Sequence, residues 1–419
     1  MMEDWVECSL DTVLIHSKEK HKPLVIEDLF YVGLEHIEKN TGKLTDKVQV
    51  AEIKTVKNKF NKGEILYGKL RPYFNKVHLS KQSGVCSTDI LVFNPTKYVE
   101  PKFAKNLIMS RQFVNEMSAN MNGVNLPRVS TKTITNYPFP LPPLPIQRAI
   151  VSKIESLFSS LDSGIADIKK AQEQLKVYRQ AVLKKAFEKI ETFESLGEIG
   201  DWKGGGTPSK RVKQYWEEGK IPWVSSRDVK RKEIHDTERH ITEIAIPNSS
   251  TKWIEKDALL FVMRSGILRR IFPIAIAKVK LCVNQDIQTL KLNEKYFTEY
   301  VYWFLTGNEG DIRHKCSKDG TTVESIDAFK LKNYKIPHCD ISLQYEIVKG
   351  IEFRLSLCDK VEENIKYSLE KSQALRQSIL KKAFEGKLLA AVEIERCKQE
   401  ADYEPASVLM ERIKKEKKN

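Results

Sequence analysis

The sequence predicts an α/β fold class, with two mixed α/β globules separated by two long antiparallel helices that form a coiled coil. The first observation is a duplication, because Gln147 to Glu188 returns as Gln344 to Glu385 and matched positions lie 197 residues apart. The second is a proline-rich segment before the first copy, and the third is helical apolar spacing in both copies. Solenoid repeats are roughly 20–50 residues long, so this pseudo-two-fold repeat indicates a duplicated module instead.

The first globule is predicted to occupy residues 1–144. Short apolar runs at Ile65–Tyr67 and Ile90–Phe93 predict strands, since turn residues precede or follow them. Apolar residues at helical spacing from Phe103 to Met117 predict a helix. A turn at Asn122-Gly123 follows.

A proline-rich exit leads from this globule into the first long helix, predicted over residues 145–190. Prolines cannot occupy a helix interior, so residues 136–143 should form a stiff, extended segment. At 1.5 Å per residue the helix would be roughly 65 Å long, too long for one edge of a compact domain. Its near-heptad apolar stripe therefore needs a partner, and the stripe consists of Ile150, Ile154, Leu157, Leu161, Ile165, Ile168, Leu175 and Val182.

The second globule is predicted over residues 191–342, with a strand at Ala258–Val262. Its turn at Asn284–Asp286 corresponds to Ser87–Asp89, and its Gly320 to Gly123, both at the offset of 197. Elsewhere the two globules differ greatly. We therefore expect a common structural role for the helices and a separate recognition role for each globule.

The second long helix is predicted over residues 343–386 and a tail over residues 387–419. The tail segment Glu404–Ser407 should open a short helix with Val408, Leu409 and Ile413 on one face. The stripe of the long helix consists of Ile347, Ile351, Leu355, Val361, Ile365, Leu369, Leu375 and Ile379.

Composition bounds the function. The formal charge is +14, from 70 Lys and Arg against 56 Asp and Glu, and this balance favours a polyanionic partner such as nucleic acid. The seven cysteines are odd in number and include no C-x-x-C, which predicts reduced thiols in a cytoplasmic protein without a structural metal site. No apolar run approaches the roughly 18 residues of a membrane span. Because the N-terminal residues are acidic and include no apolar run, we do not expect them to form a signal peptide.

Motifs of catalysis are absent from the sequence. It contains no P-loop, no G-x-S-x-G, no H-E-x-x-H and no G-x-G-x-x-G, and no histidine recurs in both copies. The segment Gly204–Pro208 could cradle a phosphate or form a tight turn, and we favour the turn because no strand is predicted before it. We expect a protein that is not an enzyme and that binds no metal.

Basic clusters follow the predicted strands and turns. Arg and Asn side chains can read base edges by paired hydrogen bonds, so these clusters are candidates for DNA contact. The alternative for each is a solvated charged face. The candidates are Lys69, Arg71, Asn75, Lys76, Arg128, Lys132, Lys210, Arg227, Lys230, Arg264, Arg269 and Arg270.

Taken together, the chain resembles the DNA-specificity subunit of type I restriction-modification systems. The resemblance covers the whole chain and rests on order, spacing and duplication. The second exit, residues 335–339, departs from it by losing most of its prolines, although we expect the same turn there. The features that carry it are the exit at 137–144, the stretch 147–155, the repeated Lys-Lys-Ala-Phe-Glu, the opening at 204–209 with Trp216 and 221–223, and the tail at 404–409.

The resemblance implies two target-recognition domains, each reading one half of an asymmetric, bipartite double-stranded DNA site. It implies two methyltransferase subunits as partners, and two restriction and translocase subunits in the full complex. The chain itself would bind no cofactor, while S-adenosylmethionine, ATP and Mg²⁺ would be bound by the partner subunits. The paired helices would set the spacer between the two DNA half-sites.

Methyltransferase docking should use what the two copies share. The alternative for these residues is that they stabilise the helix ends and the helix pair. The candidates are Arg179, Gln180, Lys184, Phe187 and their counterparts Arg376, Gln377, Lys381 and Phe384.

Two other function classes stay open at this point. One is a coiled-coil scaffold whose globules bind proteins, which would lack the steep salt dependence of phosphate contacts. The other is a methyltransferase or nuclease fused to its DNA reader, which the missing cofactor loop and metal cluster disfavour.

Overall fold

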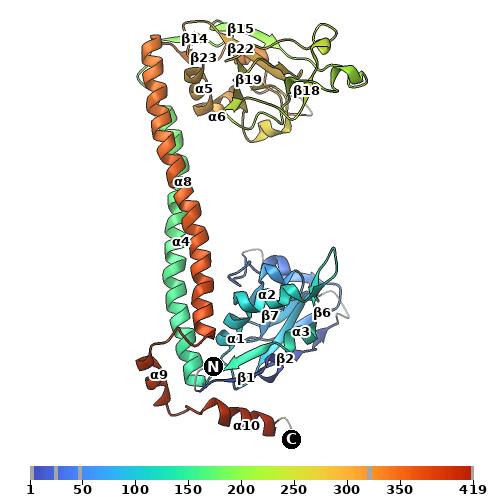
Figure 1. The fold of residues 1–419 in the computed structure, drawn as a ribbon, viewed down its shortest axis with the longest axis vertical. Coiled ribbons are helices and arrows are strands. Elements are labelled where there is room, and N and C mark those ends of the chain that lie inside the picture. Colours follow the sequence, from blue (N-terminus) through green and yellow to red (C-terminus); the bar gives the residue numbers. More distant parts are fainter. Residues whose placement is uncertain (1–3, 23–26, 46–49, 319–322, 417–419) are drawn as a thin grey trace. The chain divides into compact units, whose positions relative to one another are not determined.

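The computed structural model describes residues 4–22, 27–45, 50–318 and 323–416. It forms two compact units, the first from residues 1–168 and 367–419 and the second from residues 169–366. Each unit contains one mixed α/β domain and part of each long helix, α4 (Leu144–Ala186) and α8 (Ile341–Phe384) (Figure 1). Both boundaries between the two units therefore lie within the long helices.

The domain of the first unit is built on two sheets, with strand orders β2-β10-β7-β8 and β3-β6-β9-β4-β5. The predicted strands at residues 65–67 and 90–93 are confirmed as β7 and β10, which pair antiparallel. Its strands are β1 (Val6–Ser9), β2 (Leu14–Ser17), β3 (Lys20–His21), β4 (Glu27–Val32), β5 (Val50–Ile53), β6 (Lys57–Phe60), β7 (Ile65–Gly68), β8 (Val77–Leu79), β9 (Gly84–Cys86), β10 (Ile90–Pro95), β11 (Met121–Asn122), β12 (Arg128–Val129) and β13 (Pro138–Leu141).

The prediction of one helix over residues 103–117 is wrong in one respect, because two helices occupy this segment. They are α1 (Pro101–Ile108) and α2 (Arg111–Ala119). The Ser110 hydroxyl caps the second helix by accepting the Phe113 amide at 3.4 Å, and this cap allows the chain to turn between them. A third short helix, α3 (Thr131–Thr135), precedes the extended exit β13, which pairs with β1.

The domain of the second unit has a central sheet of order β15-β22-β19-β20-β17. The strand predicted over residues 258–262 is confirmed as β19 and is fully buried. Its elements are β14 (Phe193–Ser195), β15 (Gly200–Gly204), β16 (Ile221–Val224), β17 (Glu233–Ile234), β18 (His240–Ile241), β19 (Leu259–Val262), β20 (Ile274–Ala277), β21 (Cys282–Val283), β22 (Ile287–Leu292), β23 (Lys335–Pro337), α5 (Thr298–Gly307), α6 (Glu309–Lys315) and α7 (Ala328–Lys332).

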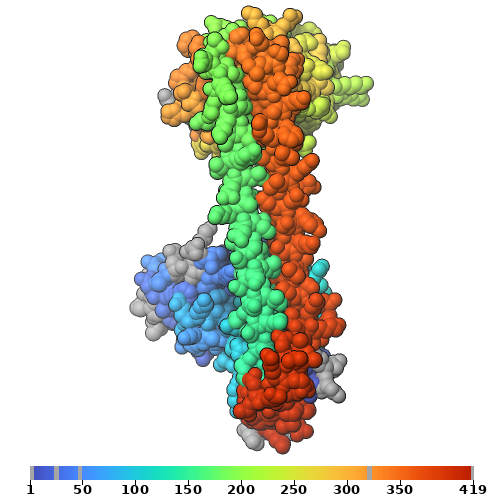
Figure 2. Space-filling model, turned by 90° about the vertical axis from the view of Figure 1, so that its left-hand side faces the viewer, coloured from blue at the N-terminus to red at the C-terminus, as the bar shows by residue number. Residues whose placement is uncertain are grey.

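The two long helices pack antiparallel within each unit, and Figure 2 shows their surfaces in contact. In the first unit, Arg376 of α8 pairs with Asp162 of α4. In the second unit, Arg179 of α4 pairs with Asp359 of α8 at 2.6 Å. Asp359 is the repeat counterpart of Asp162, and Arg376 is the repeat counterpart of Arg179. The same ion pair therefore occurs twice by internal symmetry.

The predicted apolar stripes are confirmed near the domains and wrong at two positions of α8. Ile150, Ile154 and Val182 are buried in α4. Val361 and Leu375 of α8 are instead exposed. Both positions were read from spacing alone, but the helix pair covers only one side of each helix there.

A buried glutamine anchors the start of α4 to its domain. The Gln147 side chain is fully buried, and its Oε1 accepts the Glu100 amide at 2.8 Å. Its Nε2 donates to the carbonyls of Tyr98 at 3.2 Å and Pro142 at 2.8 Å. Three main-chain groups before and around the helix are therefore satisfied by one side chain.

The second unit repeats this anchor at the offset of 197. Gln344 Oε1 accepts the Phe297 amide at 2.8 Å. Its Nε2 donates to the carbonyls of Lys295 at 2.9 Å and Cys339 at 2.8 Å. The turn expected at the second exit is therefore confirmed, although Pro337 is the one proline left in residues 335–339.

The tail belongs to the first unit and carries α9 (Ala391–Lys398) and α10 (Ala406–Glu416). The predicted helix is confirmed as α10, whose Leu409 and Ile413 are buried in the core of that unit. The prediction for Val408 is wrong, because its side chain is exposed.

Replacing the anchor glutamine should loosen one unit at a time. Gln147→Leu leaves a buried amide and two carbonyls without partners, which should cost on the order of 3 kcal/mol in the first unit. Hydrogen exchange at the Glu100 amide should then accelerate, while exchange at the Phe297 amide stays unchanged. Gln344→Leu should give the reverse pattern.

Gln174→Leu, at an exposed position of α4, is the matched control and should change neither amide. Equal acceleration at both amides in Gln147→Leu would contradict the separate anchoring of the two units.

Candidate nucleic-acid interface

Three segments of the first domain meet at the end of β7. The Lys69 amide donates to the carbonyl of Asp89 at 3.0 Å, and the Lys69 carbonyl accepts the Val129 amide at 3.1 Å. The Arg71 amide donates to the Pro127 carbonyl at 2.8 Å. The strand exit, the turn at 87–89 and the β11–β12 hairpin thus form one surface, which carries Lys69, Arg71 and Arg128.

Arg128 is fixed on this surface by a bidentate ion pair. Its Nε donates to Asp89 Oδ1 at 2.8 Å and its Nη2 to Oδ2 at 3.1 Å. The hydrogen bond from Arg128 lowers the pKa of the Asp89 carboxyl below its ordinary value. The guanidinium is half-exposed, so it is positioned by the domain and still faces solvent.

The remaining candidates of the first domain lie in different environments. Asn75 is buried with a positive φ of 47°, and its Nδ2 donates to the Met109 carbonyl at 2.9 Å. In this conformation the Asn75 side chain bonds to a main-chain group inside the domain and is not accessible to solvent. Lys76 donates to the Leu34 carbonyl, and burial lowers its pKa. Lys132 is exposed on α3.

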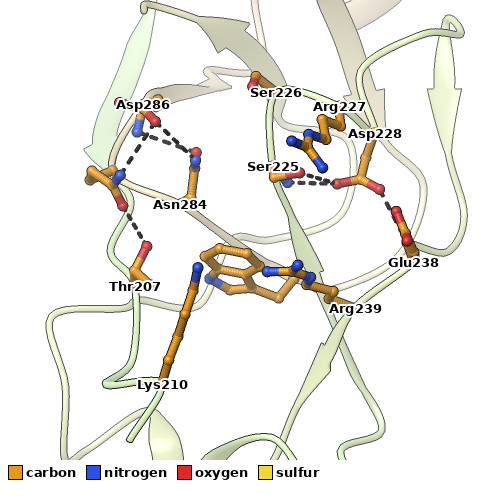
Figure 3. A pocket seen from close by; sticks show the side chains of 12 residues that line it. Thr207, Lys210, Ser225, Ser226, Arg227, Asp228, Glu238, Arg239, Asn284 and Asp286 are labelled. Atoms are coloured by element: carbon orange, nitrogen blue, oxygen red, sulfur yellow. Dashed lines mark hydrogen bonds between the residues drawn. The ribbon is translucent and has the colours of Figure 1, made fainter. Parts of the chain in front are cut away.

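The second domain presents a polar hollow of about 380 Å³ instead (Figure 3). In Figure 3 the Lys210 and Arg239 side chains reach into it from one side, and Asn284 and Asp286 from another. Lys210 and Arg227 are the sequence candidates that line it. The full lining consists of Thr207, Lys210, Trp223, Ser225, Ser226, Arg227, Asp228, Glu238, Arg239, Asn284, Gln285 and Asp286.

The glycine-rich segment borders this hollow through Thr207 and runs as irregular backbone after strand β15. A Cβ at Gly205 would fall 2.1 Å from the Asn284 carbonyl oxygen, and one at Gly206 would fall 2.4 Å from Ser250 Oγ. The amides of both glycines donate to main-chain carbonyls, so they are not free to cradle a phosphate. The tight turn that we favoured is not found, because residues 205–209 follow strand β15 as irregular backbone. The prediction that no strand precedes the segment was also wrong.

Acidic groups in the hollow bond mainly to neutral donors. Asp228 Oδ2 accepts the amide and the hydroxyl of Ser225 at 2.8 Å and 2.7 Å. Asp286 Oδ2 accepts the Asn284 and Gln285 side-chain amides at 3.2 Å and 3.3 Å. Arg227, Arg239 and Lys210 are exposed, so the hollow combines fixed acceptors with cations that face solvent.

The other candidates of the second domain lie outside the hollow. Arg264 pairs through its main chain with Ser325, as Leu70 pairs with Arg128 in the first domain. Arg269 pairs with Glu324 at 2.5 Å. Arg270 and Lys230 are exposed.

Sequence reasoning missed Arg239, Asn284 and Gln285 as site residues. The Asn284–Asp286 turn had a usable signal, because it recurs at the offset of 197. Arg239 carried no such signal, and only the fold brings it to the turn.

The candidates for partner binding separate into buried and exposed groups. Phe187 and Phe384 pack on aromatic rings of their own domains, and Arg179 and Arg376 form the ion pairs of the helix pair. Gln377 donates to the Met109 carbonyl at 3.4 Å. Gln180, Lys184 and Lys381 are exposed.

One exposed apolar pair was missed by the sequence analysis. Tyr178 and Leu375 are counterparts in the repeat, and each is 50% exposed. The spacing pattern had placed Leu375 in the buried stripe.

Within the described ranges, no group of three or more His, Cys, Asp or Glu side chains could hold a metal ion. Among the same residues, no helix has the length and apolar character needed to cross a bilayer.

A family model described as the type I restriction modification DNA specificity domain matches residues 2–174 and 188–371. The chain is 35% identical over 251 residues to the type I restriction enzyme EcoR124I/EcoR124II specificity subunit of Escherichia coli, covering 57% of this chain and 62% of that protein. It is 23% identical to the EcoKI specificity subunit of Escherichia coli strain K12, covering 78% and 74%. For the first relatives the match spans less than two thirds of their length.

Two solved structures share the fold. One is a chain from a study of complex assembly and conformational transition of the type I R-M system, with a TM-score of 0.76 and 21% identity over 92% of this chain and 99% of that one. The other is the HsdS subunit from Thermoanaerobacter tengcongensis, with a TM-score of 0.60 and 21% identity over 93% and 98%.

Removing the charge of Asp89 should loosen the hairpin of the first domain. Asp89→Asn replaces a bidentate ion pair by at most one neutral hydrogen bond, so exchange of the Val129 and Arg71 amides should rise by about threefold to tenfold. Asp286→Asn, the repeat counterpart in the second domain, should leave these two amides unchanged.

Lowering the pH should also accelerate exchange of the Val129 and Arg71 amides in the native protein. The pKa of Asp89 is lowered in the folded state, so the contribution of the pair is complete above the pKa of free aspartate, about 3.9, and is lost as pH falls through the lowered value. Exchange rates that stay constant in Asp89→Asn would show that the main-chain contacts alone hold the hairpin.

Proposed function

The chain belongs to the type I restriction-modification DNA specificity family, and we propose that it is the subunit that selects the DNA sequence in such a system. One observation carries the proposal: two domains share a helix anchor and a turn, yet present different basic surfaces. The first presents Arg128 on a hairpin with Arg71 beside it, and the second presents Lys210 and Arg227 in a hollow. The chain would perform no chemistry itself.

The difference between the surfaces supports an asymmetric, bipartite target. Phosphate contacts from Lys and Arg position a protein on DNA, while contacts to base edges specify the sequence. Two surfaces of different construction would read different bases, so each domain would read one half-site. The length of α4 and α8, which both continue from one unit into the other, would set the spacer between the halves.

The partners proposed for this chain are two methyltransferase subunits, with two restriction and translocase subunits in the full complex. S-adenosylmethionine would be bound by the methyltransferase subunits, and ATP with Mg²⁺ by the others. The duplicated helix pair supports two equivalent docking sites, because the same ion pair and the same glutamine anchor occur in each unit.

Docking would use the exposed side chains that both copies share. Lys184 and its counterpart Lys381 are exposed at the ends of α4 and α8. Tyr178 and Leu375 add an exposed apolar position to each copy. In protein interfaces, apolar side chains contribute affinity and cations contribute orientation.

Domain exchange tests the proposed function. Residues 193–340 are replaced by those of another family member, the protein is reconstituted with its methyltransferase partner, and methylated adenines are mapped. Only one half of the target should change. The reciprocal exchange of residues 4–140 is the matched control and should change the other half. Methylation within one continuous, symmetric site would refute the bipartite assignment. A change in both halves of the target after a single exchange would refute it too.

Charge reversal tests the docking surface. Lys184→Glu should weaken one of two bound methyltransferase subunits by about tenfold or more, and the double variant with Lys381→Glu should weaken both. Native mass spectrometry and sedimentation report the stoichiometry. Lys170→Glu is the control, since Lys170 is exposed on the same helix and its counterpart is Tyr367. Undiminished binding by the double variant would rule out this surface.

A further inference from the structure

The β11–β12 hairpin of the first domain ends in a tip, residues 123–127, that exposes two apolar side chains. Val124 is 98% exposed and Leu126 is 51% exposed. Single exposed apolar residues are common on protein surfaces, but two at the end of a projecting hairpin form an apolar point.

The tip is held in a defined conformation. Arg71 Nη2 donates to the Asn125 carbonyl at 3.4 Å, and Arg128 Nη1 donates to the Leu126 carbonyl at 3.2 Å. Gly123 begins the turn with a φ of 101°. A residue with a side chain would be strained in this backbone conformation. The carbonyls are thus occupied from within the domain, and Val124 is left facing outward.

The charges around the tip specify the kind of surface that it fits. Lys69, Arg71 and Arg128 stand at the base of the hairpin, where the Asp89 carboxylate pairs with Arg128 and also interacts electrostatically with Lys69. Three cations against one carboxylate leave the base of the hairpin positively charged. The positively charged base of the hairpin favours a polyanionic partner such as DNA. The apolar tip favours contact with a non-polar group on that partner. In DNA that group is the C5-methyl of thymine, which projects into the major groove.

We propose that Val124 contacts a thymine methyl group in the half-site read by the first domain and so determines specificity at that base pair. The proposal rests on the proposed function.

Uracil substitution tests the contact, because uracil lacks only the methyl group. Each thymine of the first half-site is replaced in turn, and the affinity of the reconstituted methyltransferase complex is measured. At one position the native protein should lose about threefold to fivefold in affinity, the value of one buried methyl group. Val124→Ala should bind thymine and uracil DNA equally at that position.

Val50→Ala is the matched control, since Val50 is an exposed valine of the same domain outside the hairpin. It should keep the native preference for thymine. Because Val124 is almost fully exposed, its replacement should leave the melting temperature unchanged.

The outcomes separate this inference from the proposed function. Specific binding without any uracil effect, a first half-site without thymine, or a thymine preference that survives Val124→Ala would overturn the methyl contact alone. Loss of methyltransferase affinity with unchanged DNA discrimination would overturn it too, and would assign the tip to a protein contact. Equal binding to target and unrelated DNA would overturn the proposed function as well.

Discussion

The arrangement of each unit depends on one buried glutamine at the start of its long helix. Gln147 and Gln344 each satisfy one amide and two carbonyls that the fold removes from water. Because a buried polar group without a partner is costly, these bonds favour the observed geometry between the exit strand, the domain and the helix. The sequences of the two domains have diverged around this contact, and the contact itself has not.

Around that common frame, the two domains use different means to present basic side chains. In the first, a carboxylate at the turn, Asp89, fixes an arginine on a hairpin. In the second, the corresponding Asp286 accepts neutral amides, and the glycine-rich segment packs against Val283 and Asn284 beside a hollow. A change of partner at one turn residue thus accompanies a change from a projecting surface to a concave one.

Much of the fold could be predicted from the sequence, because the repeat is long and its offset is constant. Strands β7, β10 and β19, the extended exit and helix α10 were predicted correctly, since each is a local pattern. Local patterns could not show that Ser110 divides a helix, that β15 precedes the glycines, or that Leu375 and Val361 face solvent. The burial of Asn75 and the position of Arg239 depend on contacts between distant segments, which spacing does not encode.

The reciprocal ion pairs of the long helices also bear on how such a chain could arise. Each pair takes its acid from one copy of the repeat and its base from the other, as Asp162 with Arg376 and Asp359 with Arg179. A single copy therefore already carries both members of the complementarity. This is the property that an isologous homodimer requires, so a gene duplication with fusion could preserve an ancestral self-association while freeing each domain to diverge.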